Sequence, residues 1–286
     1  MRPNPLKASA IIRIILLSLL ILILASILIG VLLGHKYITS GELAVFFGEV
    51  EGTVASEGSV SAEEVKNIEI NWVSGDVTIV RAAVTDISFS EDTGLKEKDM
   101  MVWSQKGDKL VIHSSRVKVQ IGVHKSKDLV ITIPMDYNFN DLTISTVSAN
   151  FKADSLTANS VTIQGVSGKC TFNGNNAFGT MNVETVSGDV TFNGTLRELT
   201  CEGVSANFRG YFTETPNSIQ VDGVSGDIDI TLPADAGFTA ELDTLNGHFN
   251  SDFSTTSSGD RYICGNGQCT IEVDGVSGDI NIRKAN

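Results

Sequence analysis

Aspartates recur at one position of a repeated four-residue word, and they are the first candidates for chemistry in this sequence. The word is Val-Ser-Gly-Asp, and its acids are Asp76, Asp189, Asp227 and Asp279. If the copies stack, these carboxylates form a column of oxygen ligands of the kind that Ca²⁺ prefers. Asn150 and Asn207 continue the column in variant words, but Lys169 and His248 interrupt it. Asp and Asn side chains that bond turn amides explain the same pattern, and we prefer that interpretation to a calcium site.

The four cysteines divide into two pairs. Cys170 and Cys201 fall at inward positions of the repeat, at least about 9.6 Å apart, which exceeds the roughly 7 Å Cα limit for a disulfide. We expect both to be buried thiols. Cys264 and Cys269 flank Gly-Asn-Gly, which is typical of a turn between two strands. Opposed across such a turn, they would form either a disulfide in an oxidising exterior or two free thiols.

No residue pattern predicts catalysis. Asp227 and Asp229 have the spacing of a carboxylate pair on one strand, but their parity places both on the solvent face. The four histidines lack the spacing of metal ligands, and no Gly-x-Ser-x-Gly nucleophile motif occurs. We therefore expect a protein that is not an enzyme, with no catalytic residues and no cofactor.

A repeat of about 20 residues must position these side chains, since the serine of successive words falls at 148, 167, 187, 205, 225 and 277, with Asn at 246. Apolar and polar residues alternate on both sides of the word, as at Met181 and Val183 before it and Val190 and Phe192 after it. This alternation indicates two short strands with one buried face each. A unit this small cannot bury its apolar face alone, so the copies must stack.

The sequence therefore predicts an all-β fold, specifically a β-solenoid of two-strand repeats in which sheet ladders join each coil to its neighbour. Residues 137–286 hold the regular repeats, and residues 65–136 form an irregular part that is expected to cover the first edge. The equal phase of every unit favours the solenoid over its alternative, an antiparallel β-sandwich, because hairpins would reverse direction between neighbours.

An apolar segment precedes the repeats. Residues 14–33 contain no charged residue, and as a helix they would be about 30 Å long, enough to span a bilayer. Three basic residues precede them, so residues 1–13 are predicted to be cytoplasmic and the chain beyond the span extracytoplasmic. A cleaved signal peptide is the alternative, although no Ala-x-Ala site follows the run. Residues 34–64 are predicted to be a juxtamembrane linker, and residues 65–286 the extracytoplasmic domain.

The formal net charge of -13 belongs mainly to the repeats, because residues 137–286 carry 7 basic and 18 acidic side chains. Binding to nucleic acid needs clustered Lys and Arg, so nucleic acid is excluded as a partner.

Several segments together resemble the DUF4097 family of β-repeat proteins, whose members are often labelled adhesins. They are Asn67 to Val77, Leu129 to Pro134, Leu232 to Phe238 and Ile271 to Ile282. The resemblance covers residues 65–286 and implies stacked β repeats and, in many members, a membrane anchor. It supplies no catalytic residues. Some members occur with envelope-stress signalling genes, which suggests a sensing role.

These features predict a single-pass protein of the cell membrane that acts as a binding, adhesion or scaffold module of the cell envelope. Its expected partners are the membrane, through the N-terminal helix, and an envelope protein or glycan. A regulator or sensor in envelope-stress signalling is the alternative function. A glycan-active enzyme on a β-helix ranks third.

Overall fold

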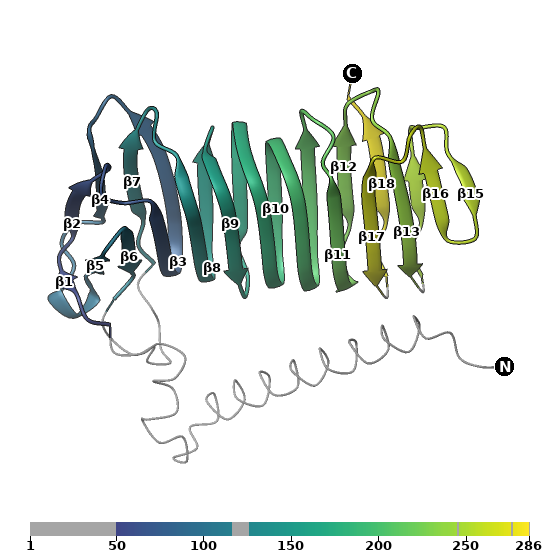
Figure 1. The fold of residues 1–286 in the computed structure, drawn as a ribbon. Helices are drawn as coiled ribbons and strands as arrows, with labels where there is room; N and C mark the ends of the chain where they lie inside the picture. Colours follow the sequence, from purple (N-terminus) through teal and green to yellow (C-terminus); the bar gives the residue numbers. More distant parts are fainter. Residues whose placement is uncertain (1–49, 116–125, 245, 276, 286) are drawn as a thin grey trace, which may run out of the picture. The chain divides into compact units, whose positions relative to one another are not determined.

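The structure, a computed structural model, describes residues 50–115, 126–244, 246–275 and 277–285 (Figure 1). These residues form strands and one short 3₁₀ helix, η2 (Glu97–Asp99), so the all-β prediction is confirmed. The predicted cytoplasmic residues 1–13 and membrane span 14–33 lie outside these ranges. Within them, no helix has the length and apolar character needed to cross a membrane.

The strands follow one another with short connections, and most carry alternating buried and exposed residues. In chain order they are β1 (Thr53–Val54), β2 (Glu57–Ser61), β3 (Asn67–Ala82), β4 (Asp86–Glu91), β5 (Val102–Lys106), β6 (Lys109–His113), β7 (Leu129–Pro134), β8 (Phe139–Asp154), β9 (Thr157–Gly165), β10 (Lys169–Phe212), β11 (Ser218–Ser225), β12 (Ile228–Leu232), β13 (Phe238–Thr244), β14 (Phe249–Ser251), β15 (Thr256–Ser258), β16 (Arg261–Cys264), β17 (Cys269–Gly275) and β18 (Ile280–Lys284).

The repeats form coils, each made of a strand, a bend at the four-residue word and a second strand. Successive coils pair in parallel and in register, as shown by Leu142 on β8, which pairs with Val161 on β9, and by Val161, which pairs with Met181 on β10. Parallel ladders join the coils throughout the described repeats, whereas the alternative antiparallel sandwich would need hairpin pairs between neighbouring repeats.

Stacking order and chain order differ near residue 270. β17 pairs in parallel with β11 on one side and with β13 on the other, and Ile271 is the register partner of both Ile219 and Ala240. β18 likewise pairs with both β12 and β14. We call β11 and β12 the inner coil, β17 and β18 the inserted coil, and β13 and β14 the outer coil (Figure 1). The inserted coil lies between the other two although it follows both in the chain.

The same reversal occurs near the first strands. β3 pairs in parallel with β6 and β7 on one side and with β8 on the other. Antiparallel strands then cover the stack, with β5 and β1 beyond β6, and β4 and β2 beyond β7. Beyond β13, antiparallel β16 and β15 play the equivalent part. Such strands cover edges that would otherwise present unpaired backbone groups.

Residues 50–64 correct the predicted linker boundary, because β1 and β2 lie within the range 34–64. Val60 on β2 is 8% exposed and pairs with Ile87 on β4. The Gly and Ser content of this stretch suggested a linker, but Gly58 lies directly against the ring of Phe89, where a Cβ would be 2.4 Å from the ring. Small residues here permit close packing, so the folded part begins before residue 65.

Aromatic rings fill much of the core between the two strands of each coil. Phe151 and Phe172 have ring centroids 5.3 Å apart, and Phe178, Phe192 and Phe212 continue the row at 5.5 and 5.7 Å. Because buried aromatic side chains remove about 150–250 Å² each from water, this row is a main source of stability. It follows from the in-register stacking, which places equivalent apolar positions over one another.

Cys170 and Cys201 lie in this core at 6% and 4% exposure, as predicted. Burial raises the pKa of each thiol to about 12. Both side chains are therefore neutral packing groups.

Glycine at the third position of the word allows the coils to approach closely at the bend. Gly226 has φ 144°, and a Cβ there would lie 1.9 Å from the carbonyl oxygen of Ala206 in the coil below. Gly278 repeats this geometry, with φ 137° and 2.1 Å to the oxygen of Gly226. Glycine thus provides the backbone conformation and the space between coils at these two bends, whereas Ala149 and Ala206 occupy the third position in the Val-Ser-Ala-Asn copies.

We expect Gly226→Ala to lower the free energy of unfolding by about 2–4 kcal/mol, from a strained positive φ and a clash with backbone. Urea denaturation measures this change. Gly223→Ala is the matched control, since a Cβ there would lie 3.4 Å from the oxygen of Gly203, an ordinary contact. We expect a change within about 0.5 kcal/mol for the control, and equal destabilisation of the two variants would contradict the proposed role of the bend.

Candidate functional site

The structure brings the predicted aspartates together in one column along the bends, which we call the Asx column. Its members occupy the fourth position of each word or its equivalent, and register pairs such as Asp76 with Asn150 place them on neighbouring coils. In stacking order they are Asp128, Asp76, Asn150, Lys169, Asp189, Asn207, Asp227, Asp279 and His248.

Side-chain oxygens in the Asx column accept hydrogen bonds from backbone N–H groups of the adjacent coil. Asn150 Oδ1 accepts from the N–H of Lys169 at 3.1 Å, and Asn207 Oδ1 accepts from the N–H of Asp227 at 2.9 Å. Asp227 Oδ1 likewise accepts from the N–H of Asp279 at 3.1 Å, and Asp279 Oδ1 accepts from the N–H of His248 at 3.2 Å. These bonds satisfy backbone donors at the bend, where the regular ladder is interrupted.

The carboxylates of the column have amide or ammonium partners. Asp76 accepts a hydrogen bond from Asn150 Nδ2 at 2.9 Å and forms an ion pair with Lys152 at 3.1 Å. The Asn150 bond first, and then Lys152, lower the pKa of Asp76 below its ordinary value. Asp189 accepts from Asn207 Nδ2 at 2.9 Å and lies 3.7 Å from Lys169 Nζ.

No grouping of three His, Cys, Asp or Glu side chains that could hold a metal ion occurs among the described residues. The proposed calcium ligands Asp76, Asp189, Asp227 and Asp279 instead bond neighbouring side chains and backbone amides. This arrangement matches the turn interpretation. Asp229, considered above with Asp227 as a carboxylate pair, also has other partners. It forms an ion pair with Arg209 at 3.3 Å and accepts a hydrogen bond from Asn281 Nδ2 at 3.0 Å.

The serines of the word hold the bends together. Ser148 Oγ donates to the carbonyl oxygen of Val73 at 3.2 Å, and Ser167 and Ser187 repeat this bond to the coil below at 3.3 Å. Several hydroxyls with the same bond are structural groups rather than candidate nucleophiles.

A second column, which the sequence did not reveal to us, lies two residues before the word. We call it the acid column; its members are Glu184, Glu202, Asp222, Asp274 and Asp243. Register pairs join Glu202 to Asp222, Asp222 to Asp274, and Asp274 to Asp243. Glu184 continues the column, because Gly203 packs on the carbonyl of Thr185.

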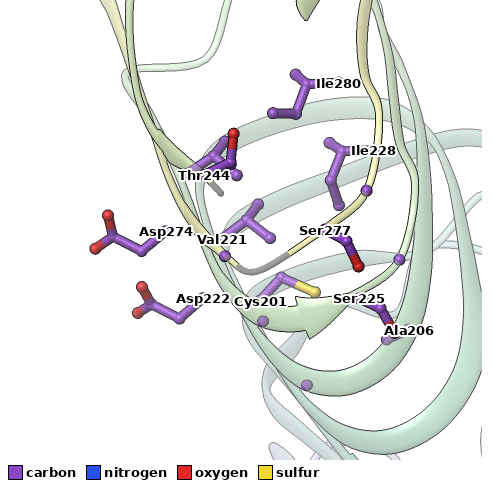
Figure 2. Close-up of a pocket in the computed structure, with 16 residues that line it drawn as sticks. Cys201, Ala206, Val221, Asp222, Ser225, Ile228, Thr244, Asp274, Ser277 and Ile280 are labelled. Carbon is purple, nitrogen blue, oxygen red and sulfur yellow. The ribbon is translucent and has the colours of Figure 1, made fainter. Parts of the chain in front are cut away.

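The acid column is partly exposed and extends over five adjacent coils. Asp222 and Asp274 point outward in Figure 2, away from the interior of the bend. Gln164 donates to Glu184 at 3.0 Å and Gln220 to Asp222 at 3.3 Å. Neighbouring rungs of a sheet are about 4.8 Å apart, so the carboxylates form a closely spaced anionic row. A search of the sequence for acids two residues before each word would have found it.

A cavity of about 30 Å³ lies inside the bends of four coils, which are the coil at the end of β10 and the inner, inserted and outer coils (Figure 2). Gly203, Gly223 and Gly275 precede the word on three adjacent coils and line the cavity, whereas Thr244 fills that position on the outer coil. The space suits about one water molecule, far less than the several hundred Å³ of a metabolite site. It is a packing gap caused by consecutive glycines.

Cys264 and Cys269 are free thiols in the structure, and the disulfide considered for them is not formed. The predicted turn does not join adjacent strands, because β13 lies between β16 and β17. Phe238 on β13 is the register partner of both cysteines, from opposite sides. Their Cα atoms are therefore about 10 Å apart, beyond the roughly 7 Å limit for a disulfide.

Parallel coil-to-coil ladders and repeated polar columns define an all-β repeat protein whose outer surface presents one residue pattern many times. The chain belongs to the Toastrack DUF4097 family, because the family model matches residues 65–283. The resemblance seen in the sequence is thus confirmed.

Solved structures with low sequence identity are also similar to this chain. A candidate adhesin from Bacteroides fragilis is 15% identical, with 81% of this chain and 98% of that chain covered and a TM-score of 0.47. A candidate cell adhesion protein from Clostridium sporogenes is 15% identical, with 80% and 99% covered and a TM-score of 0.37. A candidate lipid-binding protein from Parabacteroides distasonis is 12% identical, with 83% and 99% covered and a TM-score of 0.37. No curated protein matches the sequence.

Replacing Asn207 by Asp tests whether the Asx column is structural or binds metal. Asn207→Asp removes the bond to Asp189 and places a third carboxylate between Asp189 and Asp227, so we expect a loss of about 1 kcal/mol at pH 7. The loss should shrink as the pH falls below about 4 and the carboxyl groups are protonated. Thermal unfolding with and without Ca²⁺ measures both effects.

Asn182→Asp is the control for this substitution, because Asn182 is an exposed neighbour of Thr162 outside the column. We expect it to change the melting temperature little. Stabilisation of the Asn207 variant by millimolar Ca²⁺ would instead favour a metal site.

The lowered pKa of Asp76 gives a pH-dependent prediction. A carboxyl whose pKa is lower in the folded state stabilises the fold above its unfolded pKa, near 3.8, and loses that effect as the pH falls through the folded pKa. Asp76→Asn should therefore lower the melting temperature at pH 7 and converge with the parent below about pH 3. Asp235→Asn, at an exposed position, is the control. A constant difference at all pH values would contradict this assignment.

Proposed function

We propose that this chain is a membrane-anchored, extracytoplasmic module of the cell envelope that binds, adheres to or scaffolds a partner through its repeated outer surface. In this proposal residues 14–33 form the anchor, residues 1–13 are cytoplasmic, and the described repeats are a β-solenoid that displays the surface. Family membership supports a stacked-repeat architecture, and the columns described above support a display role.

The acid column is the observation that carries the proposal. Like charges opposite one another in a sheet repel, and the acid column places five carboxylates on adjacent coils. Places where a sequence departs from the most stable choice are expected to be functional. A row of equally spaced carboxylates offers a partner several equivalent contacts at once, and several weak contacts together can give strong binding.

The charge of the column indicates the partner's chemistry. An envelope protein with a basic surface complements it directly, and the hydroxyl groups of a neutral glycan can donate hydrogen bonds to the carboxylates. Anionic lipids and polymers are repelled unless cations bridge them. The proposal assigns the chain no catalysis and no cofactor.

Proximity labelling from the repeat domain in intact cells tests this function. The column variant Glu202→Gln/Asp222→Asn/Asp274→Asn removes three charges with little change in shape. We expect the parent chain to label a specific envelope partner and the column variant to label it at least about tenfold less, as expected when about 1.4 kcal/mol of binding energy is lost.

The matched control is Glu57→Gln/Asp86→Asn/Asp235→Asn, which removes the same charge from exposed positions outside the column. It should label the partner as the parent does. The column variant should melt at the same or a higher temperature than the parent, because it loses repulsion. Equal labelling by both variants, or no specific partner for the parent, would refute the proposal.

A further inference from the structure

The inserted coil occupies a slot between two coils that precede it in the chain. β17 pairs with β11 and with β13 along its length, and β18 pairs with β12 and with β14. The slot is therefore lined on both sides by parallel strand edges. Strands that fill the slot must have the alternating apolar and polar residues of the repeat and a bend at the same place.

The inserted coil is nearly a copy of the inner coil on which it lies. Residues 221–230 and 273–282 differ only where Asp229 is replaced by Asn281. Asn281 Nδ2 donates to Asp229 Oδ1 at 3.0 Å, and the N–H of Asp279 donates to Asp227 Oδ1 at 3.1 Å. The contacts that hold the insert are thus contacts of the repeat itself. Nothing in them requires that both coils belong to one molecule.

The connection into the slot is a turn of four residues, 265–268. Gly265 and Gly267 have φ 57° and 67°, and the turn passes from β16 to β17 across the end of β13. It must span about two strand spacings, roughly 10 Å. A connection of this kind can act as a hinge, because a different path of four residues could carry β17 away from its own slot.

The two walls of the slot also match one another. Ser218 and Thr239 both pair with Thr270, so direct pairing of the inner and outer coils would place Ile219 beside Ala240 and Val221 beside Leu242. The apolar residues of the two coils would then still lie beside one another on the same face of the sheet. The stack can therefore close behind a departing insert, which lowers the cost of opening the slot.

We propose that the inserted coil is exchanged between two copies of this chain, so that residues 269–284 of each copy fill the slot of the other. The exchanged dimer keeps every ladder of the monomer and changes only the path of residues 265–268. Its partner is a second copy of the chain, recognised by in-register stacking of the near-identical segments. The balance between monomer and dimer is then set by the hinge and by protein concentration.

Disulfide trapping between two full-length chains tests the exchange. Gln220 and Glu272 are register partners across the inner and inserted coils, so cysteines there are about 4.8 Å apart at Cα, within disulfide range. One tagged chain carries Gln220→Cys and a differently tagged chain carries Glu272→Cys. After co-refolding and mild oxidation, a heterodimer on a non-reducing gel reports an insert of one chain in the slot of the other.

Hinge length provides the second variable. Deleting Asn266 and Gly267 leaves two residues to span roughly 10 Å, which requires a fully extended path inside one chain. In the exchanged dimer the hinge need not cross the end of β13 of its own chain. We expect the trapped heterodimer to increase by roughly tenfold or more in the shortened chains, and to increase with protein concentration.

Two controls make the result decisive. The double variant Gln220→Cys/Glu272→Cys in one chain should give a monomeric disulfide, which verifies the register. A mixture of Gln220→Cys chains and Asn250→Cys chains reports random collisions. Asn250 lies on β14 of the outer coil, which pairs with β18 and not with β11. A trapped yield equal to this collision control at both hinge lengths, with the double variant crosslinked, would overturn the proposal. Failure of the double variant to crosslink would overturn the slot itself. Either outcome leaves the proposed partner binding by the acid column untouched.

Discussion

Close approach of one coil to the next at the bend is the constraint on which the rest of the structure depends. A parallel ladder needs equal register on every coil, and at several bends this places backbone beside backbone with no side chain between. Gly226 and Gly278 meet this need, and a Cβ at either position would overlap a carbonyl oxygen of the adjacent coil. Once the bends are in register, inward positions stack into the Phe row and outward positions stack into polar columns. The core and the surface pattern therefore have one common cause.

The bend also creates a problem of hydrogen bonding, which the polar residues of the word solve. Ladder bonds are interrupted where the chain turns, and buried or half-buried N–H groups without partners are costly. Asn207 illustrates the solution, because its Oδ1 accepts from the coil on one side and its Nδ2 donates to the carboxylate on the other. Asp can only accept when ionised, so a column of Asp alone would accumulate charge. Asn150, Lys169, Asn207 and His248 separate some of the five aspartates of the Asx column, which lowers the density of negative charge along the stack. The acid column has no such interruption among its five members.

The sequence predicted most of the features that repeat, although the acid column was overlooked, and it missed those that do not repeat. The spacing of the word and the alternation at Met181, Val183, Val190 and Phe192 predicted the strands, because both follow from one periodic constraint. The order of stacking was not predictable from this periodicity, since equal register lets any coil pair with any other. The choice between a disulfide and free thiols at Cys264 and Cys269 stayed open for the same reason: a local turn pattern does not reveal that β13 separates the two strands.

The region near the first strands shows a second limit of sequence reasoning. Lys127 lies in the interior, where its ammonium contacts the carboxylate of Glu91 and donates to the carbonyl oxygen of Asp99 at 2.7 Å. The ammonium also lies 4.8 Å from the ring centroid of Trp72, whose indole N–H donates to the carbonyl of Lys127 at 2.9 Å. Burial lowers the pKa of Lys127, and the hydrogen bond and charge of Glu91 oppose that shift. No periodic pattern marks these residues, because this pair occurs once.

The ends of the stack explain why stacking order and chain order differ there. Identical coils stacked in sequence would end in two exposed strand edges, each able to pair with another molecule. Here the chain passes beyond its last inward coil, turns back through antiparallel strands, and places a later coil inside the stack. The outermost strands are then short and antiparallel, as β15 and β1 are, while the near-duplicate of the inner coil is kept between two partners. Residues 273–282 nearly repeat residues 221–230, so their position inside the stack removes an edge that could extend it. In a second molecule the same segment would meet the same two strand edges, those of β11 and β13.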